Sequence, residues 1–464
     1  MGQKTEQKIG QKTNIVTIPA RFDSVVKKIA ETARKNGYDV YATGGFVRDL
    51  LLWREPKDLD VMVSCASNET VGDTSANSVM TRTISRTTPG IDLAKLVATK
   101  YSLEQPTIFE QFGTAQLIID GELIEFAMPR KESYTDNSRK PATEIGSLRQ
   151  DAMRRDFTIN SLFLLLNNSA MELLDLTGRG IVDIQNRIIR VTDTSRAEEI
   201  FTQDPLRILR AVRQNMQLNF DIEPLTKEAM VRTAKTIHKI STERVYEELE
   251  KILSGDTPSH AFRMLDEVNL LCEILPEISA IKSDNLFERT LNTLDATAPN
   301  NLVLRVSALF SEVANTNVSE TALKRLHFSN AFVGSVTTVL SHYRSLNQTL
   351  SDADIRRLAF RANDQFDNIL SLAKASSSDS IDTINDTINQ VDALKAKGEL
   401  YITKEVLTGE EIMEHFKIPP GKDVAKMKAL ALEAQFENPH ISKDEALRIL
   451  DAGRKPTLHY MLPR

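Results

Sequence analysis

The chain has 464 residues, 41% hydrophobic and 26% charged, a composition typical of a globular protein that is too long for one hydrophobic core. Its net charge of −6 excludes an overall basic signature, so any nucleic-acid binding has to come from local clusters of Lys and Arg. Two cysteines, Cys65 and Cys272, exclude a disulfide framework, and no apolar run is long enough to cross a membrane. The polar N-terminus lacks the apolar stretch of a secretory signal, so we expect a cytoplasmic protein that does not bind membranes.

The first elements of the chain lead to a glycine pair. Residues 1–20 are expected to form a flexible arm, and apolar residues recurring on one face predict a helix from Phe22 to Lys35. Gly44 and Gly45 then follow a short β-rich run, and because they lack a Cβ they let the backbone approach a ligand closely. Arg48 lies in the helical turn predicted after them.

A pair of carboxylates follows in the next predicted strand. Asp58 and Asp60 alternate with apolar residues, so both side chains point to the same face. Two neighbouring carboxylates are unfavourable unless a cation lies between them, and hard oxygen ligands suit Mg²⁺. The alternative, a water-exposed edge strand, is the more common reason for an isolated D-x-D pair. The preceding glycines and Arg48 favour the metal site.

The next segments predict a loop and a hairpin. Residues 64–92 are rich in Ser, Thr and Asn, which indicates a loop. Two alternating stretches, 114–119 and 122–128, flank Asp120-Gly121, a strong two-residue hairpin signal. Glu125 on the second strand is a third candidate carboxylate near the metal, with an exposed strand residue as the alternative.

Residues 129–150 are polar and without periodicity, which predicts a long loop. A second cluster of charged residues follows this loop: Arg154, Arg155, Asp156 and Asn160. Guanidinium forks suit the oxygens of a triphosphate, and a carboxylate such as Asp156 can accept a hydrogen bond from a ribose 2′-hydroxyl.

From about residue 195 the patterns become helical. Asp204 and Arg207 are three residues apart at the start of a predicted helix, with Pro205 in its first turn, where proline is tolerated. An acceptor and a donor fork on one face of a rigid element are suited to hydrogen-bonding the Watson–Crick edge of a base. A further amphipathic helix is expected from Thr242 to Gly255.

Taken in order, these motifs resemble those of the class II tRNA nucleotidyltransferases and bacterial poly(A) polymerases: G-G-x-V-R-D with D-x-D, then R-R-D-x-x-x-N, then E-D-x-x-R. Two positions depart from that pattern. Trp53 stands where the family usually has Gly, and Gln203 replaces Glu, which removes a charge that orients Arg207. The segment from Leu174 to Val191 matches the family's short connecting hairpin.

The resemblance implies an α+β chain, with a polymerase-β-like domain around a mixed sheet followed by an all-α C-terminal part. We expect an arm (1–20), a catalytic domain (21–194), a nucleotide-selecting neck (195–255), a helical body (256–400) and a tRNA-contacting tail (401–464). Many relatives carry a His-Asp phosphohydrolase site in the body. Here Ser311-Glu312 takes its place and none of the seven histidines is followed by Asp, so the body is expected to be a scaffold.

The reaction implied by the resemblance is addition of CCA to tRNA from CTP and ATP, with release of pyrophosphate. Asp58 and Asp60 would hold Mg²⁺, Gly44, Gly45 and Arg48 would lie against the triphosphate, and the loop from Arg130 to Gly146 would be needed for the final A. Three alternatives remain: a poly(A) polymerase, an enzyme that adds only CC or only A, and a non-catalytic RNA-binding protein.

Overall fold

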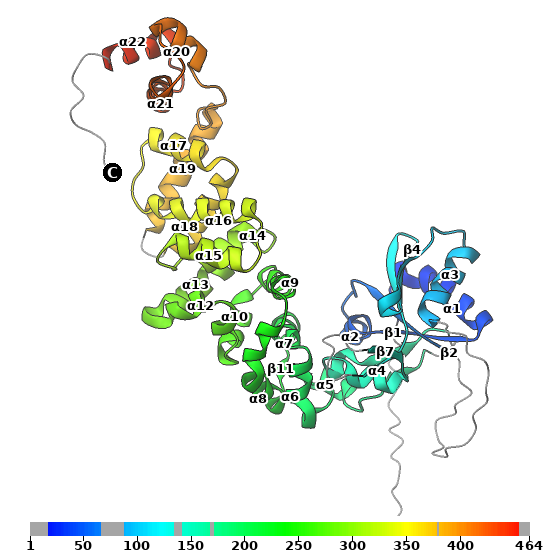
Figure 1. Ribbon diagram of the computed structural model, residues 1–464. Helices are drawn as coiled ribbons and strands as arrows, with labels where there is room; N and C mark the ends of the chain where they lie inside the picture. Colours follow the sequence, from blue (N-terminus) through cyan, green and yellow to red (C-terminus); the bar gives the residue numbers. More distant parts are fainter. Residues whose placement is uncertain (1–16, 66–87, 134–141, 168–170, 378–379, 454–464) are drawn as a thin grey trace, which may run out of the picture. The chain divides into compact units, whose positions relative to one another are not determined.

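The computed structural model describes residues 17–65, 88–133, 142–167, 171–377 and 380–453 (Figure 1). These residues divide into two compact units, Met1–Thr233 and Ala234–Arg464, each with its own buried residues. Within the described ranges, no helix has the length and apolar character needed to cross a bilayer. The predicted arm and the predicted loop at 64–92 fall largely outside the described residues, and the proposed five-part division of the chain stays a prediction.

The first unit is built on a seven-stranded mixed sheet in the order β3-β4-β5-β2-β1-β8-β9. Its strands are β1 (Tyr38–Thr43), β2 (Leu59–Cys65), β3 (Thr107–Phe109), β4 (Thr114–Ile119), β5 (Glu122–Ala127), β8 (Leu162–Leu165) and β9 (Leu173–Asp175). Only β2 and β5 pair in parallel, and the other neighbours are antiparallel. The predicted hairpin is confirmed, since Asp120 and Gly121 both have positive φ angles, 53° and 86°, between β4 and β5.

Helices cover one face of this sheet and part of the other. The first face packs against α1 (Ala20–Asn36) and α3 (Pro89–Lys100), which lie side by side (Figure 1). The apolar stripe of α1 is buried there, as its spacing predicts. On the second face, α4 (Leu148–Arg154) covers β1, β2 and β8 through a cluster of Ala152, Tyr41, Met62 and Phe163. The cluster also reaches Ala127 at the end of β5, and the part of the second face formed by β3, β4 and the start of β5 lies beyond it.

The long loop predicted at 129–150 is wrong at both of its ends. Residues Arg130–Ser133 form β6 and Ala142–Ile145 form β7, an antiparallel pair that leads into α4. The hydrogen bond from the Gly146 N–H to the Pro129 carbonyl, 2.9 Å long, closes the base of this hairpin. The strands are short and carry charged residues, so they lack the apolar alternation that identifies a strand in sequence. Residues 134–141 lie outside the described part.

The connecting hairpin predicted within 174–191 is also wrong. A helix, α5 (Gly180–Asn186), separates β9 from β10 (Ile188–Ile189), and β10 pairs in parallel with β11 (Asp221–Ile222). Strand structure therefore continues past residue 195, where the sequence predicted only helices. The helices that complete the first unit are α2 (Gly45–Leu51), α6 (Ala197–Gln203), α7 (Leu206–Leu218) and α8 (Pro224–Thr233).

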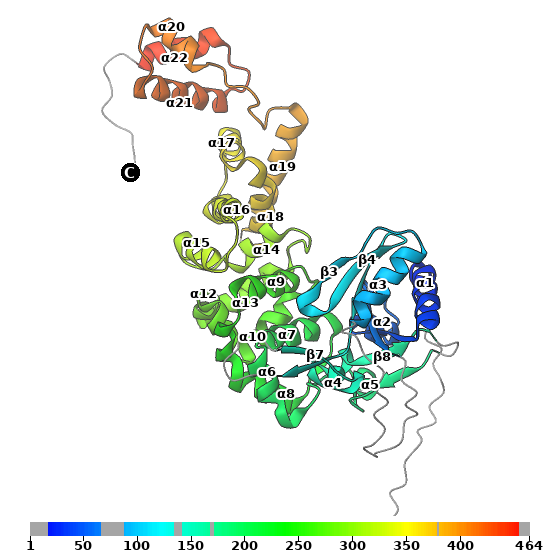
Figure 2. The ribbon, with the colours of Figure 1, turned by 45° about the vertical axis from the view of Figure 1, so that its right-hand side comes forward.

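The second unit is helical throughout its described residues, as predicted for the C-terminal part (Figure 2). Its helices are α9 (Thr242–Leu253), α10 (Pro258–Glu267), α11 (Leu271–Ile274), α12 (Pro276–Ser279), α13 (Leu286–Asp295), α14 (Leu302–Leu309), α15 (Thr316–Arg325), α16 (Asn330–His342), α17 (Asp352–Ala362), α18 (Phe366–Ser376), α19 (Ile381–Lys397), α20 (Gly409–Phe416), α21 (Lys422–Glu437) and α22 (Lys443–Gly453). Arg356 on α17 is buried and donates to the Phe436 carbonyl on α21 over 2.9 Å.

Candidate active site

The glycine pair ends β1 and begins α2. Gly44 has a φ of 71°, which disfavours any residue with a Cβ. A Cβ built on Gly44 would lie 3.5 Å from Asp60 Oδ2 and 3.6 Å from Arg155 Nη1. A side chain at position 44 would therefore contact both a carboxylate and a guanidinium of the site. The predicted approach of a ligand to these glycines stays a prediction.

The departure at Trp53 leaves the local backbone in the shape that glycine prefers. Trp53 has a φ of 56°, in the left-handed region, and is 80% exposed to solvent. A left-handed non-glycine residue costs about 1–2 kcal/mol. Trp53 therefore keeps the turn after α2 at some energetic cost, with an indole that faces water.

The carboxylates meet on neighbouring strands. Asp60 on β2 stands in register with Glu125 on β5, and Asp58 comes directly before β2. Partial withdrawal from water, the charge of Glu125 and, to a smaller extent, the charge of Asp58 raise the pKa of Asp60 to about 6, and Arg155 opposes this shift. Of the acidic residues predicted near the metal, Asp60 therefore stands beside Glu125 and is close enough to Asp58 for their charges to interact.

These carboxylates suit a divalent cation. The negative charges of Glu125 and Asp58 destabilise the ionised form of Asp60. A cation bound between the carboxylates would replace this repulsion with attraction. Within the described residues, no three acidic, His or Cys side chains converge as a complete metal cage. Mg²⁺ is commonly held by one or two carboxylates, with phosphate oxygens and water supplying the other ligands. The pair Asp58 and Asp60 fits that donor set.

A buried carboxylate positions the two adjacent arginines. Asp151, on α4, is fully buried and receives the Arg155 Nε–H on Oδ2 at 2.9 Å and the Arg154 Nε–H on Oδ1 at 2.9 Å. The same Oδ1 accepts the backbone N–H of Arg130, at the start of β6, over 3.3 Å. Asp151 therefore joins the base of the β6–β7 hairpin to both arginines. The sequence analysis did not select it, although its spacing of three and four residues before Arg154 and Arg155 is the helical signal for such contacts.

Asp156 lies at the centre of a second network. Burial alone would raise the pKa of Asp156, but the Arg210 guanidinium, the Asn160 amide and the Phe157 N–H together lower that pKa to about 2. Arg210 Nη2 lies 2.7 Å from Asp156 Oδ2, and Asn160 Nδ2 donates to Oδ1 over 3.0 Å. Asn160 in turn accepts from Arg48 Nη1 on its Oδ1, at 3.0 Å. These contacts link α2 and α7 to the segment that follows α4, around one carboxylate.

The start of α7 brings Asp204 and Arg207 to the same site. Asp204 ends α6, and the Arg207 backbone N–H donates to the Asp204 carbonyl over 3.0 Å. The Arg207 guanidinium donates to two main-chain carbonyls, those of Arg154 at 2.6 Å and Ile200 at 3.3 Å. Gln203 donates from Nε2 to Glu199 Oε1 over 3.0 Å. Main-chain carbonyls thus orient Arg207.

One pocket of about 530 Å³ gathers these side chains. Its lining contains every predicted site residue except Glu125: Gly44, Gly45, Arg48, Asp58, Asp60, Arg154, Arg155, Asp156, Asn160, Asp204 and Arg207. It also contains Arg210, Arg213 and Gln214, which the sequence analysis did not select. Their spacing along α7 after Arg207 is the signal that would have identified them, because residues three and four apart share a helix face. The volume and the many arginines suit a nucleoside triphosphate.

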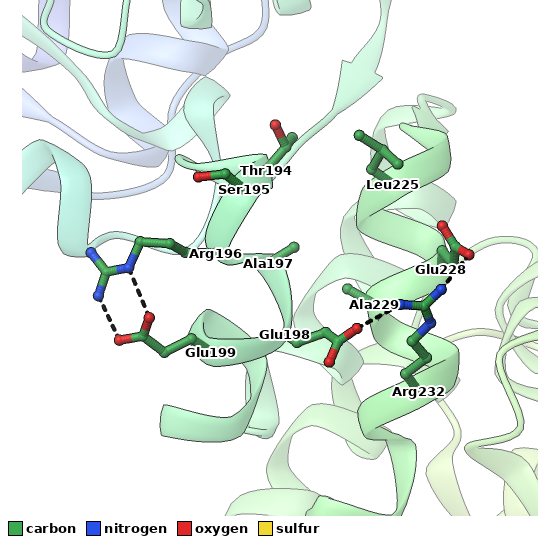
Figure 3. Close-up of a pocket in the computed structure, with 10 residues that line it drawn as sticks. All are labelled: Thr194, Ser195, Arg196, Ala197, Glu198, Glu199, Leu225, Glu228, Ala229 and Arg232. Carbon is green, nitrogen blue, oxygen red and sulfur yellow. Dashed lines mark hydrogen bonds and ion pairs between the residues drawn. The ribbon is translucent and has the colours of Figure 1, made fainter.

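A second pocket of the first unit, about 370 Å³, lies between the start of α6 and α8 (Figure 3). Its charges are paired with one another: Arg196 contacts Glu199, and Arg232 contacts Glu198 and Glu228 at 2.9 and 2.7 Å. None of its lining residues belongs to the predicted motifs. We assign this pocket no part in the chemistry.

A mixed sheet with neighbouring carboxylates and an arginine-lined pocket defines a nucleotidyltransferase. Comparisons with known proteins agree: residues 40–190 match the poly A polymerase head domain, and residues 219–282 match the probable RNA and SrmB-binding site of polymerase A. The chain therefore resembles the class II tRNA nucleotidyltransferases and bacterial poly(A) polymerases in both of these segments.

Individual relatives point the same way. The chain is 29% identical over 336 residues to the CCA-adding enzyme of Levilactobacillus brevis, covering 72% of this chain and 71% of that protein. It is 28% identical over 419 residues to the CCA-adding enzyme of Lactococcus lactis, covering 89% and 92%. The fold resembles the crystal structure of the Bacillus stearothermophilus CCA-adding enzyme in complex with CTP, with a TM-score of 0.68 and 22% identity over 94% of this chain and 98% of that one.

Proposed function

We propose that this nucleotidyltransferase adds CCA to the 3′ end of tRNA from CTP and ATP and releases pyrophosphate. The observation that carries the proposal is the single pocket in which the Asp58–Asp60 pair and the Asp204–Arg207 pair both lie. The first pair is suited to a metal and phosphates, and the second to the edge of a base. The relatives named as CCA-adding enzymes support the same activity.

Mg²⁺ is the metal that we propose for this site, held by Asp58 and Asp60. When bound, it would neutralise phosphate charge and polarise the reacting phosphorus. In the reaction the tRNA 3′-oxygen forms a bond to the α-phosphorus, the bond to pyrophosphate breaks, and the hydroxyl proton is lost. Glu125, next to Asp60 on β5, is our candidate for a third carboxylate near that hydroxyl.

The other side chains bind and orient the nucleotide. Gly44 and Gly45 offer close backbone approach, and Arg48, Arg154 and Arg155 supply donors to the triphosphate. Catalysis of this kind depends mainly on positioning and charge neutralisation. Arg207 and Asp204 read the base edge in this proposal. Arg207 is held by carbonyls that leave the remaining guanidinium donors for a ligand.

The proposed role of Asp156 in sensing the ribose carries a condition. Its carboxylate already accepts hydrogen bonds from the Phe157 N–H, Asn160 and Arg210. A ribose 2′-hydroxyl would share or displace one of these donors, because a carboxylate has about four acceptor positions. Selection for ribonucleotides would then involve the whole network around Asp156, including Asn160.

The direct test is to incubate the purified protein and Mg²⁺ with a tRNA transcript that lacks its 3′ CCA, together with labelled CTP and ATP. Product length decides between the candidates. Addition of three nucleotides supports CCA addition, a stop after CC or addition of A alone indicates a partial activity, and a long ladder of A indicates a poly(A) polymerase. Binding of the transcript without any addition would mean a non-catalytic RNA-binding protein. We propose a cytoplasmic location, where tRNA is processed.

A further inference from the structure

Two aliphatic side chains face water beside the carboxylates. Ile118 on β4 and Leu123 on β5 are register partners and are 58% and 55% exposed. In the neighbouring row of the same face, Gln116 pairs with Glu125, and Glu125 pairs with Asp60. Side chains two residues apart on a strand share a face and are separated by about 7 Å. Ile118 and Leu123 therefore form the row of side chains next to the catalytic row.

The face of β4 and β5 that carries Ile118 and Leu123 is exposed to solvent. The opposite face is covered by α1 and α3, and on the near face the Ala152 cluster covers Met62 and Phe163. The exposure of Ile118 and Leu123 shows that no described residue covers them in the same way. Two exposed apolar side chains on neighbouring strands, at the edge of a reactive site, are a candidate contact surface for a substrate.

The sheet order separates two sides of the reacting centre. Asp60 lies on β2; the glycine pair follows β1, and Arg155 stacks on Phe163 of β8, so the groups expected to hold the triphosphate lie on the β1 side. Glu125 lies on β5, the neighbour of β2 on the other side. In phosphoryl transfer the attacking oxygen and the leaving oxygen are roughly in line across the phosphorus. The attacking hydroxyl therefore has to come from the β5 side.

We propose that Ile118 and Leu123 form a platform for the 3′-terminal nucleotide of the RNA acceptor, whose base or ribose packs on the two side chains. The proposal rests on the function proposed above and adds the place of the second substrate. Apolar side chains offer contact without hydrogen-bonding groups, so they tolerate any base. This property suits an acceptor end that changes after each addition, whereas Arg207 meets only the incoming nucleotide.

The test uses the full chain with Ile118→Ser and Leu123→Ser combined. Both residues are exposed, so the variant should fold. The control is Leu96→Ser, an exposed leucine on α3, which covers the opposite face of the sheet. The probe is a tRNA transcript lacking CCA with 2-aminopurine as its last base, because the fluorescence of this base changes when the base leaves its stack on the neighbouring RNA base and packs on an apolar surface. We expect the double variant to lose most of the fluorescence change on binding and to raise KM for the RNA about tenfold.

KM for CTP should stay within about twofold of wild type, since the triphosphate groups lie on the other side of Asp60. The proposal is overturned if the double variant matches Leu96→Ser in both fluorescence and RNA KM, or if KM for CTP rises as much as KM for RNA. The fluorescence measurement needs no catalysis. A wild-type protein that adds no nucleotide but shows a fluorescence change that depends on Ile118 and Leu123 would refute the proposed function and leave the platform supported.

Discussion

Carboxylates have opposite surroundings in two pockets of the chain. In the unit of residues 1–233, Asp60 stands beside Glu125 and near Asp58, and its pKa is raised to about 6. In the unit of residues 234–464, a pocket of about 260 Å³ holds Glu312, which lies 3.1 Å from Arg289 and 3.2 Å from Arg344. The first carboxylate is withdrawn from water beside two other carboxylates, which Arg155 offsets only in part, and the second lies against two arginines.

The different surroundings of Asp60 and Glu312 distinguish a carboxylate that is suited to bind a cation from one that only stabilises the fold. Repulsion between carboxylates costs folding free energy, so its persistence indicates a ligand that relieves it. A glutamate shared by two arginines needs no such ligand. Glu312 follows Ser311 at the place where relatives with a phosphohydrolase have His-Asp, and its arginine contacts agree with the scaffold role predicted from the sequence.

The largest expected effect tests this comparison directly. Asp58→Ala or Asp60→Ala should reduce nucleotide addition by at least about a thousandfold, because the metal would lose one of its two protein ligands. Binding of tRNA should change little. The measurement is the single-turnover rate of CMP addition in Mg²⁺, together with a filter-binding Kd for the transcript.

The matched control is Glu312→Gln, which removes a pocket carboxylate from the second unit. It should leave the addition rate within about twofold of wild type, because Glu312 contacts only scaffold residues in this interpretation. The distinction between the two pockets would be wrong if both aspartate variants kept an addition rate within tenfold of wild type. It would also be wrong if Glu312→Gln lost as much of the addition rate as the aspartate variants.

The sequence predicted the parts of this site that are local in the chain. The turn at Gly44 and the Asp120-Gly121 hairpin depend on backbone rules over a few residues, and the structure agrees with both. Asp58 lies just before β2 instead of within it, although both aspartates line the same pocket. The pairing of Glu125 with Asp60 was open at that stage, because strand order is set by tertiary packing. The short charged strands β6 and β7 were missed for lack of an apolar pattern.

A second group of residues escaped prediction because its role depends on burial. Asp151 and Arg210 read as ordinary surface charges in a polar stretch and on an amphipathic helix. Their importance appears only when the fold buries Asp151 under two arginines and places Arg210 against Asp156. Arg213 and Gln214 belong to the same group, since the pocket is closed by α7 from a part of the chain distant from the glycine pair.

The second prediction concerns the arginines that Asp151 holds. Asp151→Asn keeps the shape but removes the charge that orients Arg154 and Arg155. Because hydrogen bonds to charged groups contribute about 1.5–3 kcal/mol, KM for CTP and ATP should rise roughly ten- to a hundredfold, while KM for RNA changes little. Steady-state kinetics with each substrate varied in turn measures both values.

Loss of stability alone would imitate part of this result. Asp183→Asn is the control, because Asp183 is equally buried, pairs with Arg190 at 3.1 Å and lies outside the pocket lining. Both variants should be destabilised in urea, but only Asp151→Asn should raise the nucleotide KM. If the nucleotide KM rose by a similar factor in both variants, the role of Asp151 would be purely structural.

The third prediction uses Asp156, a carboxylate inside the nucleotide pocket that is paired like Glu312. Its pKa is about 2, below its ordinary value of 3.8. A lowered folded-state pKa gives stability that is present above about pH 4 and is lost as the pH falls toward 2, worth roughly 2–3 kcal/mol. Arg210→Met should raise the pKa of Asp156 and move acid unfolding to higher pH. Urea unfolding between pH 2.5 and 7 measures this; identical pH profiles for both proteins would contradict the pairing.

The smallest expected effect concerns Gln203, which stands where the family usually has Glu. A glutamate there was expected to orient Arg207, but the Arg207 guanidinium is held by the carbonyls of Arg154 and Ile200, and Gln203 contacts Glu199. Gln203→Glu would place a second carboxylate beside Glu199. The repulsion between the two carboxylates would be reduced by Arg196, which forms an ion pair with Glu199.

Exposed charges of this kind change binding energies by less than about 1 kcal/mol. We therefore expect the ratio of kcat/KM for CTP to that for ATP to stay within about threefold of wild type. Arg207→Ala, measured alongside, should change the same ratio by about tenfold or more, since it removes the donor itself. A tenfold sharpening in Gln203→Glu would show that a charge at position 203 orients Arg207 after all, and that the two carbonyls are not sufficient to fix the arginine when the nucleotide is bound.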